Sequence, residues 1–408
     1  MLGPMLAAFV LTLAPADDAI PVPAKATVLT LDFRDRPIGE AAEELGRRAG
    51  LSLVQDNPRD GRWKKRTITL EVPGPVSLLE ALDRFCETAS ISRYSNASRQ
   101  PLAPQEREIR LTHQGEPAQS SATVYVGAFR LGPLTLIEQG ELNFVSPPTP
   151  ALPTGPVPPP SDPSLLPVPD GPVHVEIMVT PEPGRLCLQA GPLHSLVAVD
   201  ERGQTLLSPG VSKDGLPPPP GGLDLGELGG LLKIPLEIPA NQPGRVIARI
   251  AGKLPLDVAA RSVRDPVTVK LADAKGRTIP LGGAALTVRE VAFDGDRKVD
   301  LHLTLKLDGP QPASTNQARD ESFGRLMGYA SLAVEALDAQ GKRAKGRTVS
   351  MSASADELRL GLTFGASAEA GLPTELRTYE LERARWDLPF EFKDIPLGPA
   401  PGPRGADR

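Results

Sequence analysis

Residues 26–113 alternate between β-type and helical patterns, and this order constrains the fold more than any other feature of the chain. Pro37 stands where a first helical turn begins, and apolar residues then recur at the spacing of one helix face up to Gly50, a typical C-terminal cap. Ser77 and Glu80 have the capping-box spacing and predict a second helix. Short alternating runs surround both helices. The segment therefore predicts an α+β module of the order β-α-β-β-α-β-β.

Three segments of this module carry a family resemblance: Thr30–Ile38 (TLDFRDRPI), Ala49–Val54 (AGLSLV) and Val76–Leu82 (VSLLEAL). Together with the order of elements, they resemble the secretin and TonB short N-terminal (STN) domain, a small periplasmic module. Most of the matching positions are core and capping residues, which define a fold rather than a chemistry. The resemblance implies a periplasmic interaction module and raises the possibility of an accessory component of a secretion or TonB-linked system.

Length and composition indicate more than one domain. A chain of 408 residues exceeds one ordinary core, since domains commonly hold about 150 residues. The net charge of −5, with basic and acidic residues interspersed, disfavours nucleic acid as a partner. The 46 prolines and 39 glycines disfavour long helices, so we expect strands, turns and linkers after the first module.

The N-terminus has the pattern of an export signal. The apolar run Leu6–Ala14 is followed by the small-x-small pattern Ala14–Ala16, which is typical of signal-peptidase cleavage. We therefore expect residues 1–19 to be a signal peptide; an uncleaved anchor is the alternative, although the run is short for a bilayer span. No later segment is predicted to cross a membrane. The predicted location is the periplasm or cell envelope.

The remainder of the chain repeats itself. Three pairs of segments match in the same order: Val173–Val179 with Leu301–Leu307, Ser195–Gln204 with Ser331–Lys342, and Arg245–Val258 with Glu375–Phe392. Their alternating apolar residues and Gly/Pro turns are typical of antiparallel β-sandwiches.

The repeat predicts two tandem antiparallel β-sandwiches, at 122–271 and 277–397, and a mainly β chain overall. Two Pro/Gly-rich segments, 146–172 and 215–230, are expected to be insertions in the first sandwich. We expect 398–408 to be a disordered tail.

No motif predicts catalysis, a metal or a cofactor. His174 and His302 occupy the same polar position in the repeat, but each has too few potential ligands nearby for a metal site. Asp294-Gly-Asp296 is explained by a hairpin turn without calcium. Cys86 and Cys187 fall in different domains, so we expect two separate buried thiols.

One basic cluster is a candidate binding site. Its residues are consecutive and lie in an expected loop of the first module: Arg62, Trp63, Lys64, Lys65 and Arg66. Such a cluster can contact an anionic partner, which could be a lipid head group, a wall polymer or an acidic protein. The alternative is a solvated turn.

The sequence favours a non-enzymatic exported envelope protein that binds a protein or an anionic polymer, or serves a structural role. The alternative is an exported hydrolase whose carboxylates converge only in the fold. A deep cleft with two nearby carboxylates would favour the hydrolase.

Overall fold

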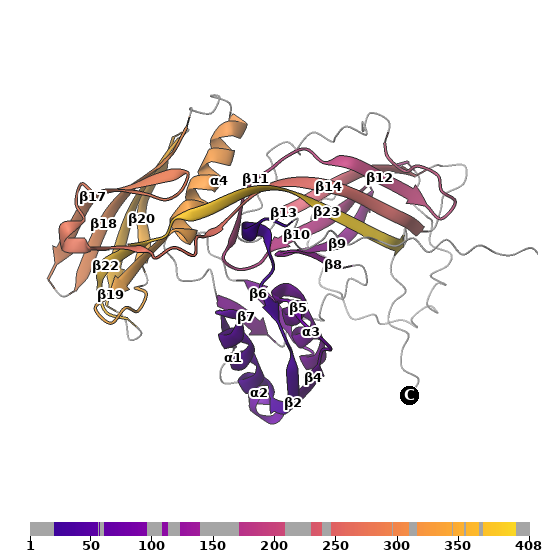
Figure 1. Ribbon diagram of the computed structural model, residues 1–408, viewed down its shortest axis with the longest axis horizontal. Helices are drawn as coiled ribbons and strands as arrows, with labels where there is room; N and C mark the ends of the chain where they lie inside the picture. Colours follow the sequence, from indigo (N-terminus) through magenta and orange to yellow (C-terminus); the bar gives the residue numbers. More distant parts are fainter. Residues whose placement is uncertain are drawn as a thin grey trace, which may run out of the picture.

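The structure, a computed structural model, has three hydrophobic cores: one in the N-terminal module and one in each of two β units that follow it (Figure 1). The prediction of a mainly β chain is confirmed. The expected signal peptide, most of the two Pro/Gly-rich insertions, the C-terminal tail and Asp296 lie outside the described residues. The structure describes residues 20–55, 57, 61–95, 108–112, 123–138, 171–208, 230–238, 246–295, 297–309, 316–344, 346–354, 356–366 and 370–396.

The N-terminal module places three helices against small sheets. Its elements are β1 (Val28–Leu29), β2 (Asp32–Pro37), α1 (Ile38–Ala49), β3 (Ser52–Gln55), α2 (Arg62–Lys65), β4 (Thr67–Glu71), β5 (Val76–Ser77), α3 (Leu78–Ala89), β6 (Ser92–Ser95) and β7 (Glu108–Thr112). The sheets pair β1 with β5, β2 with β4, and β3, β7 and β6 in that order. Only the β3–β7 pair is parallel among the pairings described.

The locally encoded features of this module are confirmed. Gly50 caps α1 in the left-handed conformation with φ of 66°. The Ser77 hydroxyl accepts the backbone N–H of Glu80 at 3.3 Å and so caps α3. The expected first strand differs, because it divides into β1 and β2, and β2 contains a register shift near Asp35, whose φ is 46°.

The first β unit encloses its core between two sheets. Its strands are β8 (Val124–Val126), β9 (Phe129–Glu138), β10 (Gly171–Pro181), β11 (Arg185–Ala190), β12 (His194–Asp200), β13 (Gly230–Ile238) and β14 (Val246–Arg261). One sheet has the order β13-β10-β9-β8 and the other β11-β14-β12. Ile177 of the first sheet and Ile250 of the second are fully buried in the same core. The short 3-10 turn Val22–Ala24, which precedes the N-terminal module, adds Ala24 to this core.

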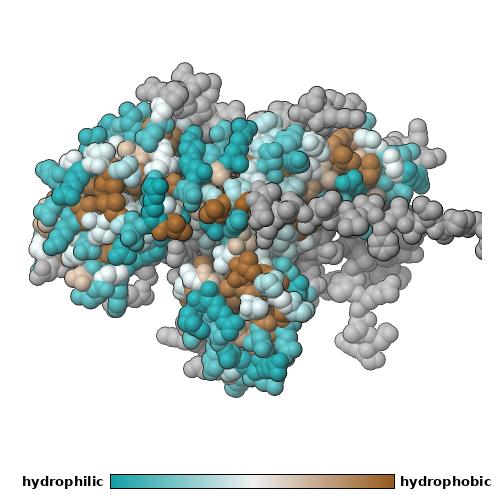
Figure 2. All heavy atoms as spheres, in the orientation of Figure 1, coloured by the Kyte–Doolittle hydropathy of each residue, from teal (hydrophilic) through white to brown (hydrophobic). Residues whose placement is uncertain are grey.

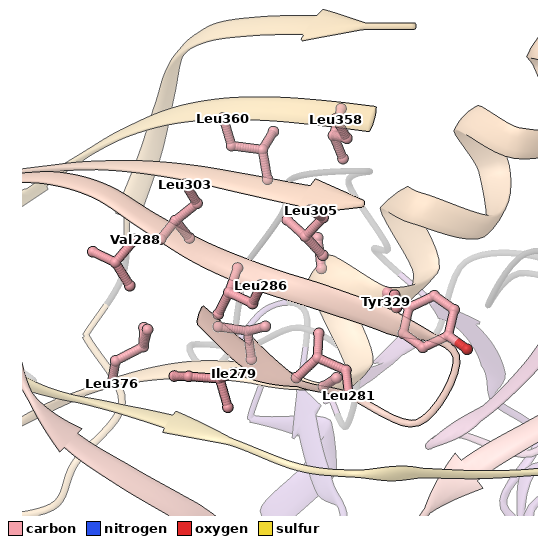
Figure 3. Packing of buried hydrophobic residues seen from close by; sticks show 14 of the residues in the cluster. Ile279, Leu281, Leu286, Val288, Leu303, Leu305, Tyr329, Leu358, Leu360 and Leu376 are labelled. Carbon is pink, nitrogen blue, oxygen red and sulfur yellow. The ribbon is translucent and has the colours of Figure 1, made fainter. Parts of the chain in front are cut away.

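The second β unit repeats this arrangement with an added helix. Its elements are β15 (Val267–Lys270), a 3-10 turn (Leu271–Asp273), β16 (Thr278–Pro280), β17 (Ala284–Asp294), β18 (Lys298–Leu307), α4 (Asn316–Leu332), β19 (Val334–Asp338), β20 (Gly346–Ala353), β21 (Glu357–Gly365), β22 (Pro373–Thr378) and β23 (Leu381–Pro396). The sheets have the orders β16-β17-β18-β21-β20 and β15-β22-β19. Leucines from β17, β18 and β21 pack with Leu376 of β22 and Tyr329 of α4 (Figure 3).

Helix α4 replaces part of an expected strand. Ser331 and Leu332, predicted to begin a strand, form its last residues, and β19 starts at Val334. The helix packs directly on β11, since a Cβ at Gly328 would lie 2.5 Å from the Leu186 side chain.

The two units share strands, which corrects the expected boundary between them. β14 and β23 pair antiparallel along their whole lengths. Val246 lies opposite Pro396 at one end and Arg261 lies opposite Leu381 at the other, so the two strands run along both units (Figure 1). Leu381 lies in the second core, whereas Phe390 and Phe392 lie in the first. The segment expected to close the second sandwich therefore completes the core of the first, because its apolar residues find their partners there.

The first pair of matched segments, Val173–Val179 and Leu301–Leu307, occupies equivalent positions. β10 lies between β9 and β13, and β18 lies between β17 and β21, with antiparallel pairing in every case. Figure 2 shows a mostly hydrophilic face of the second unit with smaller hydrophobic areas. Within the described part of the chain, no helix has the length and apolar character needed to cross a membrane.

Candidate functional site

Four of the five residues of the predicted basic cluster form helix α2 rather than a loop, and Arg66 follows the helix. Trp63 is 4% exposed and belongs to the core of the N-terminal module, so it is a core residue and not a surface contact. Lys65 is exposed, and Arg66 donates from Nη2 to the carbonyl of Ala89 at 2.7 Å. Arg62 and Lys64 lie in the same helix. The aromatic member of the predicted contact patch is therefore unavailable to a partner.

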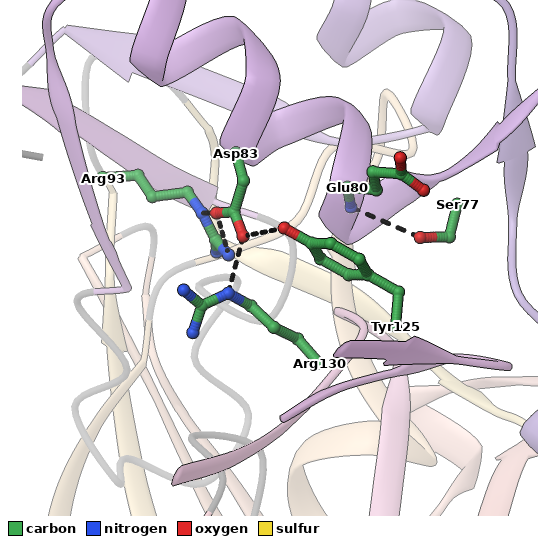
Figure 4. A network of polar contacts seen from close by, with 6 residues as sticks. All are labelled: Ser77, Glu80, Asp83, Arg93, Tyr125 and Arg130. Carbon is green, nitrogen blue, oxygen red and sulfur yellow. Dashed lines mark hydrogen bonds and ion pairs between the residues drawn. The ribbon is translucent and has the colours of Figure 1, made fainter. Parts of the chain in front are cut away.

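A polar network fastens the N-terminal module to the first β unit. Asp83 of α3 accepts hydrogen bonds from Arg93 Nε at 3.0 Å, Tyr125 Oη at 2.7 Å and Arg130 Nε at 2.6 Å (Figure 4). Burial would raise the pKa of the Asp83 carboxyl, but Arg93, Arg130 and the Tyr125 hydroxyl together hold it below its usual value. Tyr125 and Arg130 belong to β8 and β9, so this ionised carboxylate links the two parts.

A second contact between the N-terminal module and the first β unit involves a buried carboxylate. Glu182, which follows β10, is 1% exposed and accepts the backbone N–H of Thr27 at 2.9 Å. Burial raises the pKa of Glu182 to about 7, although the Thr27 N–H and the charge of Arg185 oppose the shift. Arg185 also donates to the carbonyl of Lys25 at 3.1 Å. The contacts of Asp83 and Glu182 are therefore structural contacts between the two parts rather than an accessible site.

The candidate site is a hollow of about 440 Å³ in the second β unit, which we call the arginine hollow. Three separate segments line it: the end of β14 with the residues after it, strand β19 with its following turn, and the end of β22 with the residue after it. The charged and aromatic residues of the lining are Arg261, Arg264, Glu335, Arg343, Arg377 and Tyr379. Four arginines thus face one carboxylate, in a protein whose net charge is −5.

Glu335 organises part of this lining. Its Oε1 accepts Nη1 of Arg261 at 2.6 Å and also pairs with Arg343, while its Oε2 accepts the Tyr379 hydroxyl at 2.9 Å. Arg261 additionally stacks over the Tyr379 ring, with Cζ 3.9 Å from the centroid, and donates to the Leu332 carbonyl. Burial would raise the pKa of Glu335, but Arg261, Arg343 and the Tyr379 hydroxyl lower it. Glu335 is therefore an ionised, fully engaged carboxylate.

The other two arginines, Arg264 and Arg377, are not paired with Glu335. Nε of Arg377 is buried and has no hydrogen-bond partner. Arg264 pairs with Glu380 at 2.8 Å, but its side chain is 75% exposed, where screening makes such a pair weak. Arg377 lies opposite Glu335 in the β19–β22 register. The hollow therefore presents guanidinium donors with capacity for an additional acceptor.

A hydrogen-bonded turn carries Arg343 to the hollow. Asp338 Oδ1 accepts the backbone N–H groups of Gln340 at 2.9 Å and Lys342 at 2.8 Å, and Oδ2 accepts that of Gly371 at 2.9 Å. The Gly371 N–H, followed by those of Lys342 and Gln340, holds the pKa of Asp338 below its usual value.

The first unit has the same turn, but no arginine or glutamate occupies the positions that correspond to Arg343 and Glu335. Asp200 Oδ1 accepts the N–H groups of Arg202 at 2.9 Å and Gln204 at 2.8 Å, two and four residues later as in the second unit. Aligning the two turns sets Thr205 at the place of Arg343 and Val197 at the place of Glu335. The strand partner of Val197 is Ala251, whereas that of Glu335 is Arg377.

The chemistry of the lining suits binding. Guanidinium groups are permanent hydrogen-bond donors with a planar fork that fits oxyanions. Glu335 is held ionised by two arginines, so it is poorly suited to exchange protons with a substrate. No single sequence motif marks this site, because its residues come from three distant segments.

The remaining candidate residues form no such site. His302 is exposed, and His174 Nε2 lies 3.4 Å from Glu176 Oε1. Among the described residues, no group of three or more His, Cys, Asp or Glu side chains could hold a metal ion. Cys86 and Cys187 are free thiols buried in different cores, as expected, and burial raises the pKa of Cys86 to about 12.

Comparisons with known protein families and with curated proteins found no match. Among solved structures, the crystal structure of a conserved domain protein from Bacillus anthracis is similar at 9% identity, with a TM-score of 0.15. The similarity covers 65% of this chain and 89% of that one. At this TM-score the likeness carries no argument about fold or function.

Proposed function

We propose that this chain is a non-enzymatic exported envelope protein that binds an anionic partner through the arginine hollow. One observation carries the proposal: four arginines surround a single carboxylate that is already engaged. In this account an STN-like module precedes two tandem β-sandwiches, and export places the protein in the periplasm or cell envelope. The same basic surface disfavours a cationic ligand.

The hydrolase alternative requires two carboxylates of different protonation state near one bond. The arginine hollow contains one carboxylate, Glu335, whose lowered pKa opposes a role as general acid. Its arginines instead match a partner with many negative charges. Shared β14–β23 pairing and the Asp83 network support a scaffold that holds the hollow and the N-terminal module in fixed positions.

Co-sedimentation of the protein with a purified glycerol-phosphate polymer, an anionic envelope polymer, tests this proposal. The chain length of the polymer is measured afterwards. We expect the full chain, expressed without residues 1–19, to bind in low salt and to leave the polymer intact. Binding should weaken as salt rises, because screening shortens the range of the arginine charges. Time-dependent shortening of the polymer would establish the hydrolase alternative, and an absence of binding would overturn the proposal.

A further inference from the structure

From the geometry of the arginine hollow we infer that it is a binding site for one phosphoryl group, with Arg377 as the principal ligand and with no counterpart in the first β unit. This inference rests on the proposed function and adds the chemical class of the ligand. Three features carry it: the convergence of guanidinium groups, the engagement of Glu335 and the contrast between the two units.

Guanidinium groups from three directions favour a tetrahedral anion. Arg264 follows β14, Arg343 follows β19 and Arg377 lies in β22, so donors reach the hollow from three elements. A planar carboxylate is satisfied by one bidentate fork, whereas a phosphoryl group has three strongly accepting oxygens. Four arginines line the hollow with Glu335, and when Glu380, the partner of Arg264, is included, the positive groups still outnumber the carboxylates by four to two.

Arg377 is the one arginine of the hollow that has no ion pair among the described residues. Its Nε is buried without a hydrogen-bond partner, and a buried unsatisfied donor destabilises a protein unless a ligand completes it. Arg261 and Arg343 are instead held by Glu335, which is 6% exposed at its side chain. Glu335 therefore orients two guanidinium groups and leaves Arg377 to bind the incoming anion.

The first unit supplies an internal control for this assignment. Its turn at Asp200 has the same two side-chain hydrogen bonds as the turn at Asp338. At the places of Glu335, Arg343 and Arg377 it has Val197, Thr205 and Ala251, none of which can bind an anion through its charge. The inference therefore requires one phosphoryl site per chain, although the β unit occurs twice.

Isothermal titration of the full chain with inorganic phosphate at neutral pH and low salt tests the inference. We expect one phosphate per chain. Arg377→Gln should weaken binding by about tenfold or more, since it removes a charge-assisted hydrogen bond. Arg377→Lys should restore only part of the affinity, because lysine keeps the charge but lacks the fork. The matched control is Arg359→Gln, an exposed arginine of the same unit outside the hollow, which should leave binding unchanged.

Two further probes define the ligand class and its source. Acetate, a planar carboxylate, should bind at least about tenfold more weakly than phosphate. If glycerol 3-phosphate binds more tightly than phosphate, the ligand is an esterified phosphoryl group. If the two bind equally, the site recognises the phosphoryl group alone. Both results support a phosphoryl ligand. Acetate binding as well as phosphate would overturn the class.

The remaining outcomes separate this inference from the proposed function. Unchanged phosphate affinity in Arg377→Gln, with an unaltered unfolding midpoint, would overturn the assignment of Arg377. Polymer binding without phosphate binding would overturn the inference and leave the proposed function standing. Loss of binding to both would overturn both. If Arg377→Gln fails to fold, Arg377→Lys and Arg264→Gln keep the test decisive, because each should still lower phosphate affinity.

Discussion

The two β units have the same framework and different surfaces. In each, a central strand lies between two antiparallel neighbours, and an aspartate fixes a turn by accepting two backbone N–H groups. Around the first turn lie Val197 and Thr205, whereas around the second lie Glu335 and Arg343. The first unit instead carries the N-terminal module. The contrast teaches that the framework depends on buried leucines and turn hydrogen bonds, while surface positions beside the turn are free to form a site.

The largest expected effect concerns the strand that joins the units. Phe392→Ala should destabilise the first unit by about 3–5 kcal/mol, because Phe392 is 1% exposed in its core despite lying near the C-terminus of the second. Denaturant unfolding measures the loss of stability, and hydrogen exchange of the backbone amides of β10 shows whether the first unit is the part affected. Lys393→Ala is the exposed control on the same strand. Loss of protection confined to β17–β21 would contradict the shared-core assignment.

The second prediction concerns Glu182, a buried carboxyl of the first unit. Its folded pKa of about 7 lies above the ordinary value of 4.5, so the folded state holds its proton more tightly than the unfolded chain does. The stability from this group is complete below the unfolded pKa and is lost as pH rises through about 7. The span corresponds to at most ~3 kcal/mol.

Glu182→Gln should therefore flatten the pH dependence, so that its stability relative to the wild type is greater at about pH 8 than at about pH 5. Denaturation midpoints at the two pH values are the measurement. The exposed Glu237→Gln is the control, which should keep the wild-type dependence. A Glu182→Gln chain that still loses stability over this range would show that another group is responsible.

The two turns should respond in parallel to loss of their aspartates but differ in binding. Asp200→Ala should cost roughly 1–3 kcal/mol, because backbone N–H groups lose a charged acceptor. Asp338→Ala should lower the unfolding midpoint further, since Gly371 also loses its partner. Only Asp338→Ala should weaken phosphate binding, because its turn carries Arg343. Equal loss of binding in both variants would break the comparison between the units.

The smallest effect is expected at the basic cluster. Changing Arg62, Lys64, Lys65 and Arg66 to Ser should leave stability within about 0.5 kcal/mol, apart from the single bond of Arg66 to the Ala89 carbonyl. We expect weaker capture of an anionic partner in low salt, measured by co-sedimentation. Trp63→Ala is the contrasting variant, since loss of this core side chain should unfold the N-terminal module. Unchanged capture by the quadruple variant would exclude the cluster as a contact.

Features encoded by neighbouring residues were predictable from the sequence. Gly50 and the Ser77–Glu80 spacing located the ends of two helices, because a cap depends on residues within one turn. The repeat likewise identified β10 and β18 as equivalent strands.

Features that depend on distant partners were not predictable. An alternating pattern marks β23 as a strand but does not say which core receives Phe392. Trp63 among basic residues has the appearance of a surface contact, and only the packing of α2 buries it. Arg264, Arg343 and Arg377 are far apart in sequence, so their convergence required the fold. The sequence signal for this site is the difference between the two copies of the turn, because Arg343 stands in the second where Thr205 stands in the first.

Hydrogen–deuterium exchange of the full chain with and without inorganic phosphate reports on both β units in one experiment and tests whether only the second unit binds the anion. We expect slower exchange on phosphate addition in residues 261–264, 335–343 and 373–379 of the second unit. Residues 197–206 and 247–252, the equivalent segments of the first unit, should exchange at unchanged rates. Equal protection in both units, or protection confined to the first, would contradict the claim that one copy of a shared framework has become an anion site.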